Sequence, residues 1–357
     1  MIKIGFVINY IVKNGPSNVV LNIINNLDKS KYDISLITLF SENDEEIVDK
    51  LREEKVIVYE CRKLSRIKCI LGKNKEFTDI VNEGNYDVLH THGFIPDILS
   101  SRLKCSAKRI STIHNNMYED YLDTYGYFKS RVFISLHLIA LKKIDICVGC
   151  SKSVYEALKE KIKSITFIRN GVKPVDTQTD ITREILHIPE DAKIFLYAGA
   201  LNAGKNVVWL IDEFVKFHAD NEYLLVLGSG DKESECIEKS DSHVQMLGFC
   251  SNPISYMNIS DVYISASSSE GFSISILEAL SSGLGLFLSN IPSHREIIEI
   301  QDEIYLGEFF DDSNFNSKLQ LLRDKRFIKK KIRNFQIERL SGKAMTEQYD
   351  VIYNKKN

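Results

Sequence analysis

The chain has 357 residues, of which 44% are hydrophobic and 27% are charged, so it is long enough to form two domains with separate cores. Its net charge of −3 argues against a general nucleic-acid-binding protein, and no apolar run approaches the ~18 residues of a membrane span. The seven cysteines have no framework spacing, which indicates a reducing cytoplasm.

Apolar runs and helical patterns alternate from the start of the sequence. The continuous apolar run Ile2–Ile8 predicts a strand buried on both faces of a parallel sheet, and it is too short and strand-like for a signal peptide. After a turn, apolar residues recur at helical spacing from Val19 to Leu27. Further strands are predicted at Ile34–Leu39, Val56–Tyr59, Asp87–Gly93, Arg109–Asn115, Ile144–Ser151 and Ile165–Val172. This alternation predicts a doubly wound α/β domain.

The first half of the chain is basic. Residues 1–173 include 27 basic and 21 acidic residues, a net charge of +6, whereas the remainder carries −9. Two segments of this half, Cys61–Lys75 and Lys129–Lys143, combine basic residues with apolar residues at helical spacing. Such segments are typical of helices that lie on an anionic membrane, and equally of surface helices with a solvated basic face. We expect a reversible peripheral contact with an anionic membrane.

The second half repeats the α/β pattern. Lys173–Glu190 contains two of the six prolines and indicates a linker. A strand at Ile194–Ala198, a glycine-containing loop and a helix at Val207–His218 follow. Strands at Tyr223–Leu227 and Val244–Leu247 both end at glycines, and ligands bind outside the carboxyl ends of such strands. A strand at Leu286–Ser289, a helix from Glu296 and a helical, charged stretch at Asp311–Tyr353 complete the prediction.

The most informative stretch is Ser265–Gly283. It follows the short apolar run Val262–Ile264, which predicts a buried strand, and Ser273 has the position of an N-cap before an apolar helix. A helix N-terminus is a binding site for phosphate, whereas Glu270 and Glu278 suit hydrogen bonds from sugar hydroxyls. The segment predicts a nucleotide-sugar site; the alternative is an ordinary strand–helix crossover with solvated glutamates.

Glu270 and Glu278 lie in the pattern S-E-G-F-x4-L-E-A-L-x2-G. This pattern resembles the Glu-x7-Glu signature of the retaining GT-B glycosyltransferases of family 4, also called glycosyl transferases group 1. The resemblance implies an α/β fold with two Rossmann-like parallel-sheet domains that face each other across a cleft. It implies an N-terminal acceptor-side domain at 1–173, a linker at 174–190, a C-terminal nucleotide-sugar-binding domain at 191–339, and a C-terminal helix at 340–357 that returns to the first domain.

The resemblance also assigns roles to residues. Asp87–Gly93 and Arg109–Asn115 look like the family's cleft-bordering loops, which places His114 against the donor sugar and His92 on the acceptor side; the alternative for each is a structural histidine at a strand end. Gly199–Lys205 is similar to the loop that holds the donor diphosphate, with Lys205 retained and Ala200 in place of the usual arginine. The implied catalytic residues are His114, Lys205 and Glu270, and the implied donor-binding residues are Gly15, Gly248, Phe249, Phe272, Ser273, Ile274, Ser275 and Glu278.

The function that the resemblance implies is a metal-independent transferase of the hexosyl or N-acetylhexosaminyl type. It would move a sugar, with retention of configuration, from a nucleotide sugar to a glycan or lipid-linked acceptor in cell-surface polysaccharide biosynthesis, for example of a capsule. We expect a UDP-sugar rather than a GDP-sugar donor, no cofactor, no nucleic-acid partner, and a cytoplasmic location that is peripheral to the inner face of the cell membrane. His90 and His92 project from one strand face without a third ligand, so no metal is expected there. The alternatives are a GT-B nucleotide-sugar epimerase and a non-catalytic GT-B partner subunit, the second of which Ala200 favours.

Overall fold

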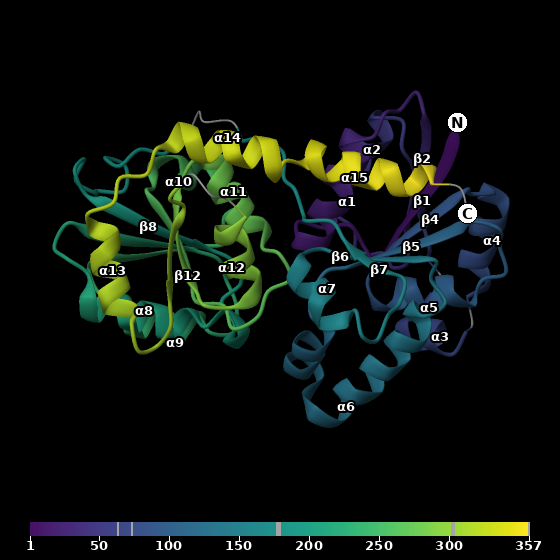
Figure 1. The fold of residues 1–357 in the computed structure, drawn as a ribbon, viewed down its shortest axis with the longest axis horizontal. Helices are drawn as coiled ribbons and strands as arrows, with labels where there is room; N and C mark the ends of the chain where they lie inside the picture. The colour runs from purple at the N-terminus through teal and green to yellow at the C-terminus, as the bar shows by residue number, and fades with distance from the viewer. Residues whose placement is uncertain (63, 73, 176–179, 301–303, 356–357) are drawn as a thin grey trace. The chain divides into compact units, whose positions relative to one another are not determined.

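The computed structural model describes residues 1–62, 64–72, 74–175, 180–300 and 304–355. The chain divides into two compact units: unit 1 comprises Met1–Gly171 and Gly342–Asn357, and unit 2 comprises Val172–Ser341. Each unit contains one parallel sheet, with seven strands in unit 1 and six in unit 2 (Figure 1). The predicted fold class, two Rossmann-like α/β units, is confirmed. The described part of 174–190 belongs to unit 2 and forms neither a helix nor a strand.

The sheet of unit 1 has the strand order β3-β2-β1-β4-β5-β6-β7. Strand β1 pairs with both β2 and β4, so successive connections leave it in opposite directions and its carboxyl end is a topological switch point. The elements are β1 Ile2–Ile8, α1 Gly15–Asn26, β2 Tyr32–Thr38, α2 Glu45–Glu53, β3 Ile57–Glu60, α3 Arg66–Ile70, α4 Lys75–Gly84, β4 Val88–His92, α5 Phe94–Arg102, β5 Lys108–Ile113, α6 Met117–Leu141, β6 Ile146–Gly149, α7 Lys152–Leu158, β7 Ile165–Phe167 and α15 Gly342–Asn354.

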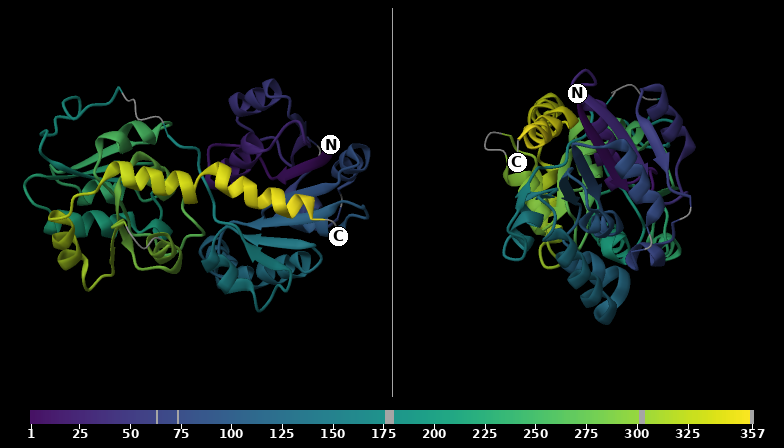
Figure 2. Two further views of the ribbon diagram at one scale, coloured as in Figure 1. Left: turned by 45° about the horizontal axis from the view of Figure 1, so that its top comes forward. Right: turned by 90° about the vertical axis from the view of Figure 1, so that its right-hand side faces the viewer.

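The last helix of the chain completes unit 1. Helix α15 packs against α1, and Figures 1 and 2 show it, in yellow, beside the purple N-terminal elements. A buried polar network fixes it to the sheet: His90 Nδ1 lies 2.8 Å from the Tyr353 hydroxyl, and His90 Nε2 lies 2.8 Å from Thr112 Oγ1. The Tyr349 hydroxyl lies 2.7 Å from the same Thr112 oxygen. Burial lowers the pKa of His90 to about 3, so this ring is a neutral structural group.

The sheet of unit 2 has the strand order β10-β9-β8-β11-β12-β13, and its switch point lies between β8 and β11. A hydrophobic cluster packs this sheet against helices of the same unit. It includes the fully buried Phe195, Phe214 and Phe287. The elements are β8 Lys193–Ala198, the 3₁₀ helix η1 Ala203–Lys205, α8 Val207–Phe217, β9 Glu222–Leu227, α9 Glu233–Lys239, β10 Val244–Gly248, α10 Pro253–Ile259, β11 Val262–Ser265, α11 Ile274–Ser282, β12 Gly285–Ser289, α12 Pro292–Glu299, β13 Gly307–Phe310, α13 Phe315–Arg323 and α14 Lys329–Arg339.

Two predictions need correction, and one strand was missed. The segment Cys61–Lys75 is not one amphipathic helix: its described part forms only the five-residue helix α3, and α4 begins at Lys75. The stretch Asp311–Tyr353 is divided into α13, α14 and α15, with breaks after Arg323 and after Arg339. The edge strand β13 was not predicted, because its four residues alternate too briefly to give a strand signal.

Candidate functional site

The strongest candidate site lies at the switch point of unit 2. Because β8 and β11 are neighbours, the loops that follow them leave the same edge of the sheet side by side. The Ser268 backbone N–H donates to the Gly204 carbonyl at 2.9 Å and ties the two loops together. This contact brings two predicted site residues together: Lys205 Nζ lies 2.5 Å from Glu270 Oε1. The Ser267 hydroxyl donates to the same carboxylate oxygen at 2.9 Å.

The Lys205–Glu270 pair is only partly shielded from water. The Lys205 side chain is 28% exposed and the Glu270 side chain is 12% exposed. An ammonium group beside a carboxylate can serve two parts of one ligand, since the ammonium attracts an anion and the carboxylate accepts hydrogen bonds from hydroxyl groups. The pair is therefore suited to a ligand that is both phosphorylated and polyhydroxylated.

Helix α11 begins next to this pair. Ser273 is the N-cap residue, as predicted, but its side chain forms no cap hydrogen bond. The first N–H groups of a helix have no partner within the helix, and they carry the positive end of its dipole. Phe272 is buried and anchors the turn, while Ser273, Ile274 and Ser275 stay partly accessible. The backbone amides of Ile274 and Ser275, the first two residues of α11, therefore have no acceptor within the helix and are suited to an anion.

Glu278 lies in the second turn of α11 and is partly buried. Burial raises the pKa of its carboxyl to about 7, because the surrounding protein solvates the charged form less well than water does. Glu278 consequently changes its charge near neutral pH. Hydrogen bonds from a hydroxylated ligand would favour the ionised form.

Glycines bring neighbouring strand ends close to the loop after β8. At Gly228, just beyond β9, a Cβ atom would lie 1.8 Å from the Gly199 carbonyl oxygen, so no larger residue fits without moving the backbone. Gly248 ends β10 with a positive φ of 66°, and the next side chain, Phe249, is 70% exposed. An exposed aromatic ring at this edge of the sheet is a suitable surface for a planar base.

Sequence reasoning missed His294, in the first turn of α12. Its Nδ1 lies 3.0 Å from the Ser289 carbonyl oxygen, while its Nε2 is buried and has no hydrogen-bond partner among the described residues. Burial lowers the pKa of His294 to about 4, and the charges of Glu270 and Lys205 act on it in opposite directions. His294 is therefore a neutral ring close to the Lys205–Glu270 pair. Its only sequence signal is a histidine shortly after the strand-ending Ser289.

Unit 1 contains a pocket of about 300 Å³ at the carboxyl ends of β1, β4 and β5. His92 and His114, from the ends of β4 and β5, both line it; their rings stack, with His92 Nδ1 3.0 Å from His114 Nε2. Burial lowers the pKa of His114 to about 4 and that of His92 well below its ordinary value. Both rings are neutral at pH 7, so one N–H donates to the other ring. Gly15, the first residue of α1, lies between Asn14 and Pro16, which also line the pocket.

A second polar group in this pocket was not predicted. Asp97 Oδ2 lies 2.8 Å from His137 Nε2, and the Tyr121 hydroxyl lies 2.7 Å from His137 Nδ1. The Thr91 hydroxyl donates to the other oxygen of Asp97. All four side chains are buried, so this network presents a fixed set of polar atoms along one wall of the pocket. No local sequence pattern brings together Thr91, Asp97, Tyr121 and His137.

Two family models match the chain. The model of glycosyl transferases group 1 matches residues 178–337, and the model of glycosyltransferase family 4 matches residues 13–175. Together they cover most of both units, and they define the protein class as a glycosyltransferase of the GT-B type. The chain belongs to the family 4 glycosyltransferases, the glycosyl transferases group 1.

Relatives and solved structures extend along the whole chain. It is 26% identical to the O-antigen biosynthesis glycosyltransferase WclY of Escherichia coli, over 99% of this chain and 98% of that protein. It is 25% identical to the Escherichia coli UDP-Gal:alpha-D-GlcNAc-diphosphoundecaprenol alpha-1,3-galactosyltransferase, over 99% of this chain and 98% of that protein. The structure of Anabaena HepE in complex with UDP-glucose is similar in fold, with a TM-score of 0.79 at 12% identity over 99% of both chains.

No described helix combines the length and the apolar composition that a membrane span requires. This holds for residues 1–62, 64–72, 74–175, 180–300 and 304–355.

Proposed function

We propose that the protein transfers a hexosyl or N-acetylhexosaminyl group from a UDP-sugar to a glycan or lipid-linked saccharide, in the biosynthesis of a cell-surface polysaccharide. The observation that carries this proposal is the Lys205–Glu270 pair beside the N-terminus of α11. The preference for UDP rests on the UDP and UDP-glucose complexes of HepE and on the UDP-Gal named for one relative. The lipid-linked acceptor rests on the diphosphoundecaprenol in that relative's name.

The donor is held by charge and by hydrogen bonds from its hydroxyl groups. The amides of Ile274 and Ser275 donate to the diphosphate, and those of Phe272 and Ser273 face the sugar hydroxyls. Lys205 has three N–H groups, so it can keep its bond to Glu270 while it donates to the leaving phosphate.

Four residues complete the donor site in this proposal. Glu270 accepts hydrogen bonds from the sugar's 3- and 4-hydroxyls, and Glu278 accepts them from the ribose. Gly248 and Phe249 border the base. Each hydrogen bond to an ionised carboxylate contributes about 1.5–3 kcal/mol.

Transfer proceeds with retention of configuration and without a metal ion. The acceptor oxygen forms a bond to the anomeric carbon on the face from which the diphosphate leaves, and a leaving phosphate oxygen takes the acceptor's proton. Lys205 and the α11 amides stabilise the charge that develops on the leaving group. His114, neutral at pH 7, positions the donor sugar by hydrogen bonding and is not required as a base.

The acceptor side is assigned to the pocket of unit 1. His92 and the Asp97–His137–Tyr121 network supply fixed donors and acceptors there, and the pocket volume of about 300 Å³ suits a small polar group such as a saccharide unit.

A donor panel tests the proposal. We expect a UDP-sugar to raise the melting temperature more than GDP- or ADP-sugars do, and we expect Glu278→Ala to reduce that shift strongly. Lys216→Ala, at an exposed lysine of α8, is the matched control and should leave the shift intact. The proposal fails when no nucleotide sugar gives a shift that depends on Glu278.

Product analysis separates the alternatives. With a polyprenyl-diphosphate-linked saccharide, the transferase releases UDP and forms an α-linked product from an α-linked donor, with or without EDTA. An epimerase would convert one nucleotide sugar to another with no acceptor present. A non-catalytic partner subunit would bind the donor without releasing UDP.

We also propose that unit 1 docks reversibly on an anionic membrane through α6. The side chains of Tyr127, Phe128 and Val132 are 60%, 84% and 58% exposed, beside the basic Lys129 and Arg131. Apolar side chains next to cations favour the boundary between lipid headgroups and acyl chains. Helix α3 is too short to contribute a second amphipathic face.

Liposome sedimentation tests this docking. We expect binding to vesicles that contain phosphatidylglycerol and a large loss of binding in the Phe128→Ser, Val132→Ser double variant. Ile328→Ser, at a comparably exposed apolar residue of unit 2, is the control. Equal partitioning onto neutral and anionic vesicles at low salt would contradict the proposal.

A further inference from the structure

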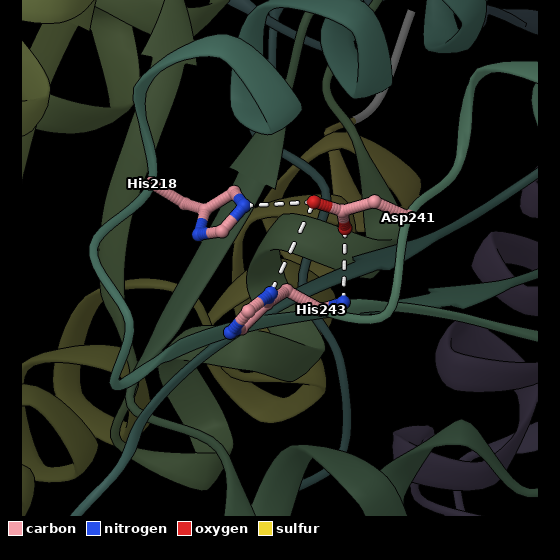
Figure 3. A group of neighbouring side chains, drawn as sticks. All are labelled: His218, Asp241 and His243. Atoms are coloured by element: carbon pink, nitrogen blue, oxygen red, sulfur yellow. Dashed lines mark hydrogen bonds and ion pairs between the residues drawn. The ribbon is translucent and has the colours of Figure 1, made fainter.

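The amino edge of the sheet in unit 2 carries a cluster that the transferase site does not use. His218 caps the end of α8 just before β9, and Asp241 and His243 lie in the connection from α9 to β10 (Figure 3). Gly228 and the proposed donor-binding residue Gly248 lie at the opposite, carboxyl ends of the same two strands. The cluster is therefore remote from the proposed chemistry within its own unit.

One ring nitrogen of each histidine is directed at the same carboxylate oxygen. His218 Nε2 lies 2.9 Å from Asp241 Oδ2, and His243 Nδ1 lies 3.9 Å from the same oxygen. One ligand atom from each of the three residues lies within 4.8 Å of the others. Figure 3 shows the two rings and the carboxylate converging.

The other ring nitrogen of each histidine is held by a backbone carbonyl. His218 Nδ1 lies 3.0 Å from the Ala219 oxygen, and His243 Nε2 lies 3.2 Å from the Asp220 oxygen. A carbonyl can only accept, so these contacts favour the tautomers with the proton on those nitrogens. The carboxylate oxygen can likewise only accept, so His218 Nε2, 2.9 Å away, either donates a proton to it or shares a cation with it.

Three electron-pair donors that converge in this way are satisfied by a cation. A histidine that donates its second N–H to a carbonyl while the first nitrogen faces a shared centre is the common arrangement of metal-binding histidines. The Ser242 hydroxyl, 3.5 Å from His243 Nδ1, lies at the limit of a hydrogen bond and competes weakly.

The geometry of the cluster suits a small tetrahedral ion. Ligand atoms about 2.0–2.2 Å from a tetrahedral zinc ion are about 3.4 Å apart, which lies between the two measured separations from Asp241 Oδ2. The rings are already packed: His218 stacks on Phe214, and His243 packs on His218 and Tyr223. The Asp241 carboxylate is 33% exposed, and its other oxygen, Oδ1, accepts a hydrogen bond from the His243 backbone N–H at 2.9 Å.

We propose that His218, Asp241 and His243 bind a Zn²⁺ ion, with water as the fourth ligand. Two imidazoles and a carboxylate form a donor set that zinc accepts, and the partial exposure of the cluster leaves room for the water. The ion connects the α8–β9 and α9–β10 connections and stabilises the amino edge of unit 2. This role is independent of sugar transfer.

Zinc titration of the untagged, chelator-treated full chain tests the proposal. Isothermal titration calorimetry with ZnCl₂ should show one site per chain, and zinc should raise the melting temperature. His218→Asn and His243→Asn should each weaken zinc binding at least tenfold. Loss of a residue that only hydrogen-bonds to a metal ligand already costs about tenfold or more, and loss of a ligand should cost at least as much. His187→Asn, at an exposed histidine of unit 2, is the matched control and should bind as the wild type does.

Two measurements keep the outcome decisive. Visible absorption of the Co²⁺-loaded wild type should have the intensity of tetrahedral coordination, which requires no variant to fold. The donor-induced thermal shift should be the same in His218→Asn and the wild type, which shows that the variant is folded. The proposal is wrong if the wild type does not bind zinc. It is also wrong if both cluster variants still bind zinc, or if His92→Gln abolishes the binding.

Discussion

The two units place different chemistry at the same topological position. At the carboxyl ends of its central strands, unit 1 presents stacked, neutral histidines above a buried Asp97–His137 pair. Unit 2 presents an ammonium, a carboxylate and the start of a helix. The scaffold of parallel strands and crossover helices is the same in both. In the proposed function, this difference lets unit 1 accept uncharged hydroxyl groups and unit 2 hold a sugar attached to a diphosphate.

Burial acts on both units in the same physical direction. It favours the neutral form of each ionisable group, which lowers the pKa of His114 to about 4 and raises the pKa of Glu278 to about 7. The consequences differ because the shift moves the pKa of His114 away from neutrality and the pKa of Glu278 toward it. His114 becomes insensitive to pH in the physiological range, whereas Glu278 becomes sensitive.

The largest effect on activity is expected for substitution of Lys205, the cation of the candidate site in unit 2. Lys205→Ala should lower kcat/KM by on the order of 10²–10³-fold, the loss typical when one group that stabilises a developing anion is removed. Lys205→Arg should recover part of the activity, and Lys216→Ala should have no effect. Steady-state release of UDP measures all three, and wild-type kcat/KM in Lys205→Ala would remove this residue from the site.

A substitution of Glu278 should affect donor binding and protein stability in opposite directions. Glu278→Gln should weaken donor binding about ten- to a hundredfold, because it removes hydrogen bonds to an ionised group worth about 1.5–3 kcal/mol. The same change should stabilise the donor-free protein at pH 8. Calorimetric titration and thermal melts measure the two quantities, and a loss of both affinity and stability would indicate damage to the fold instead.

The sign of the stability effect follows from the raised pKa. Between its ordinary value of 4.5 and about 7, the folded protein binds the Glu278 proton more tightly than the unfolded chain does. The free energy of unfolding therefore loses a contribution from Glu278 as the pH rises through this range, and the loss is complete above pH 7.

Donor affinity should depend on pH through the same group. With a pKa of about 7, Glu278 is about one-tenth ionised at pH 6, so the wild-type donor constant should weaken by up to about tenfold between pH 8 and pH 6. In Glu278→Gln, donor affinity should not change between pH 6 and pH 8. If the histidines alone controlled binding, donor affinity of the wild type would not change over this range either. Calorimetric titration at several pH values distinguishes the two.

The smallest effect is expected in unit 1. Asp97→Asn removes the charged partner of His137 and should raise the acceptor KM by about tenfold, at a stability cost of about 1–3 kcal/mol. The donor-induced thermal shift should not change. A lower melting temperature with an unchanged acceptor KM would mean that the network is purely structural.

The sequence predicted the strand, turn and helix around Glu270 and Glu278 because the signals for these elements are local. Val262–Ile264, Glu270 and Glu278 lie within one strand–turn–helix segment, whose order alone places them together. By contrast, Asp97, Tyr121 and His137 meet only through the packing of α5 against α6.

Long-range contacts also explain the other omissions. His294 acquires its surroundings from the end of β12 and from the Lys205–Glu270 pair, which lie in different parts of the sequence. The His218–Asp241–His243 cluster forms because two connections meet at one edge of the sheet, whereas the sequence drew attention to His90 and His92. His90 proved to be a structural group for α15.

The discontinuity of unit 1 has a consequence for biosynthesis. A ribosome completes Met1–Gly171 long before it makes Gly342–Asn354, yet the hydroxyls of Tyr349 and Tyr353 are the partners of Thr112 and His90 inside that early segment. The nascent first unit must wait, with part of its interior uncovered, while all of unit 2 is translated. Unit 2 is contiguous, so it can reach its native state first, and the usual order of N-terminal before C-terminal domain folding is reversed.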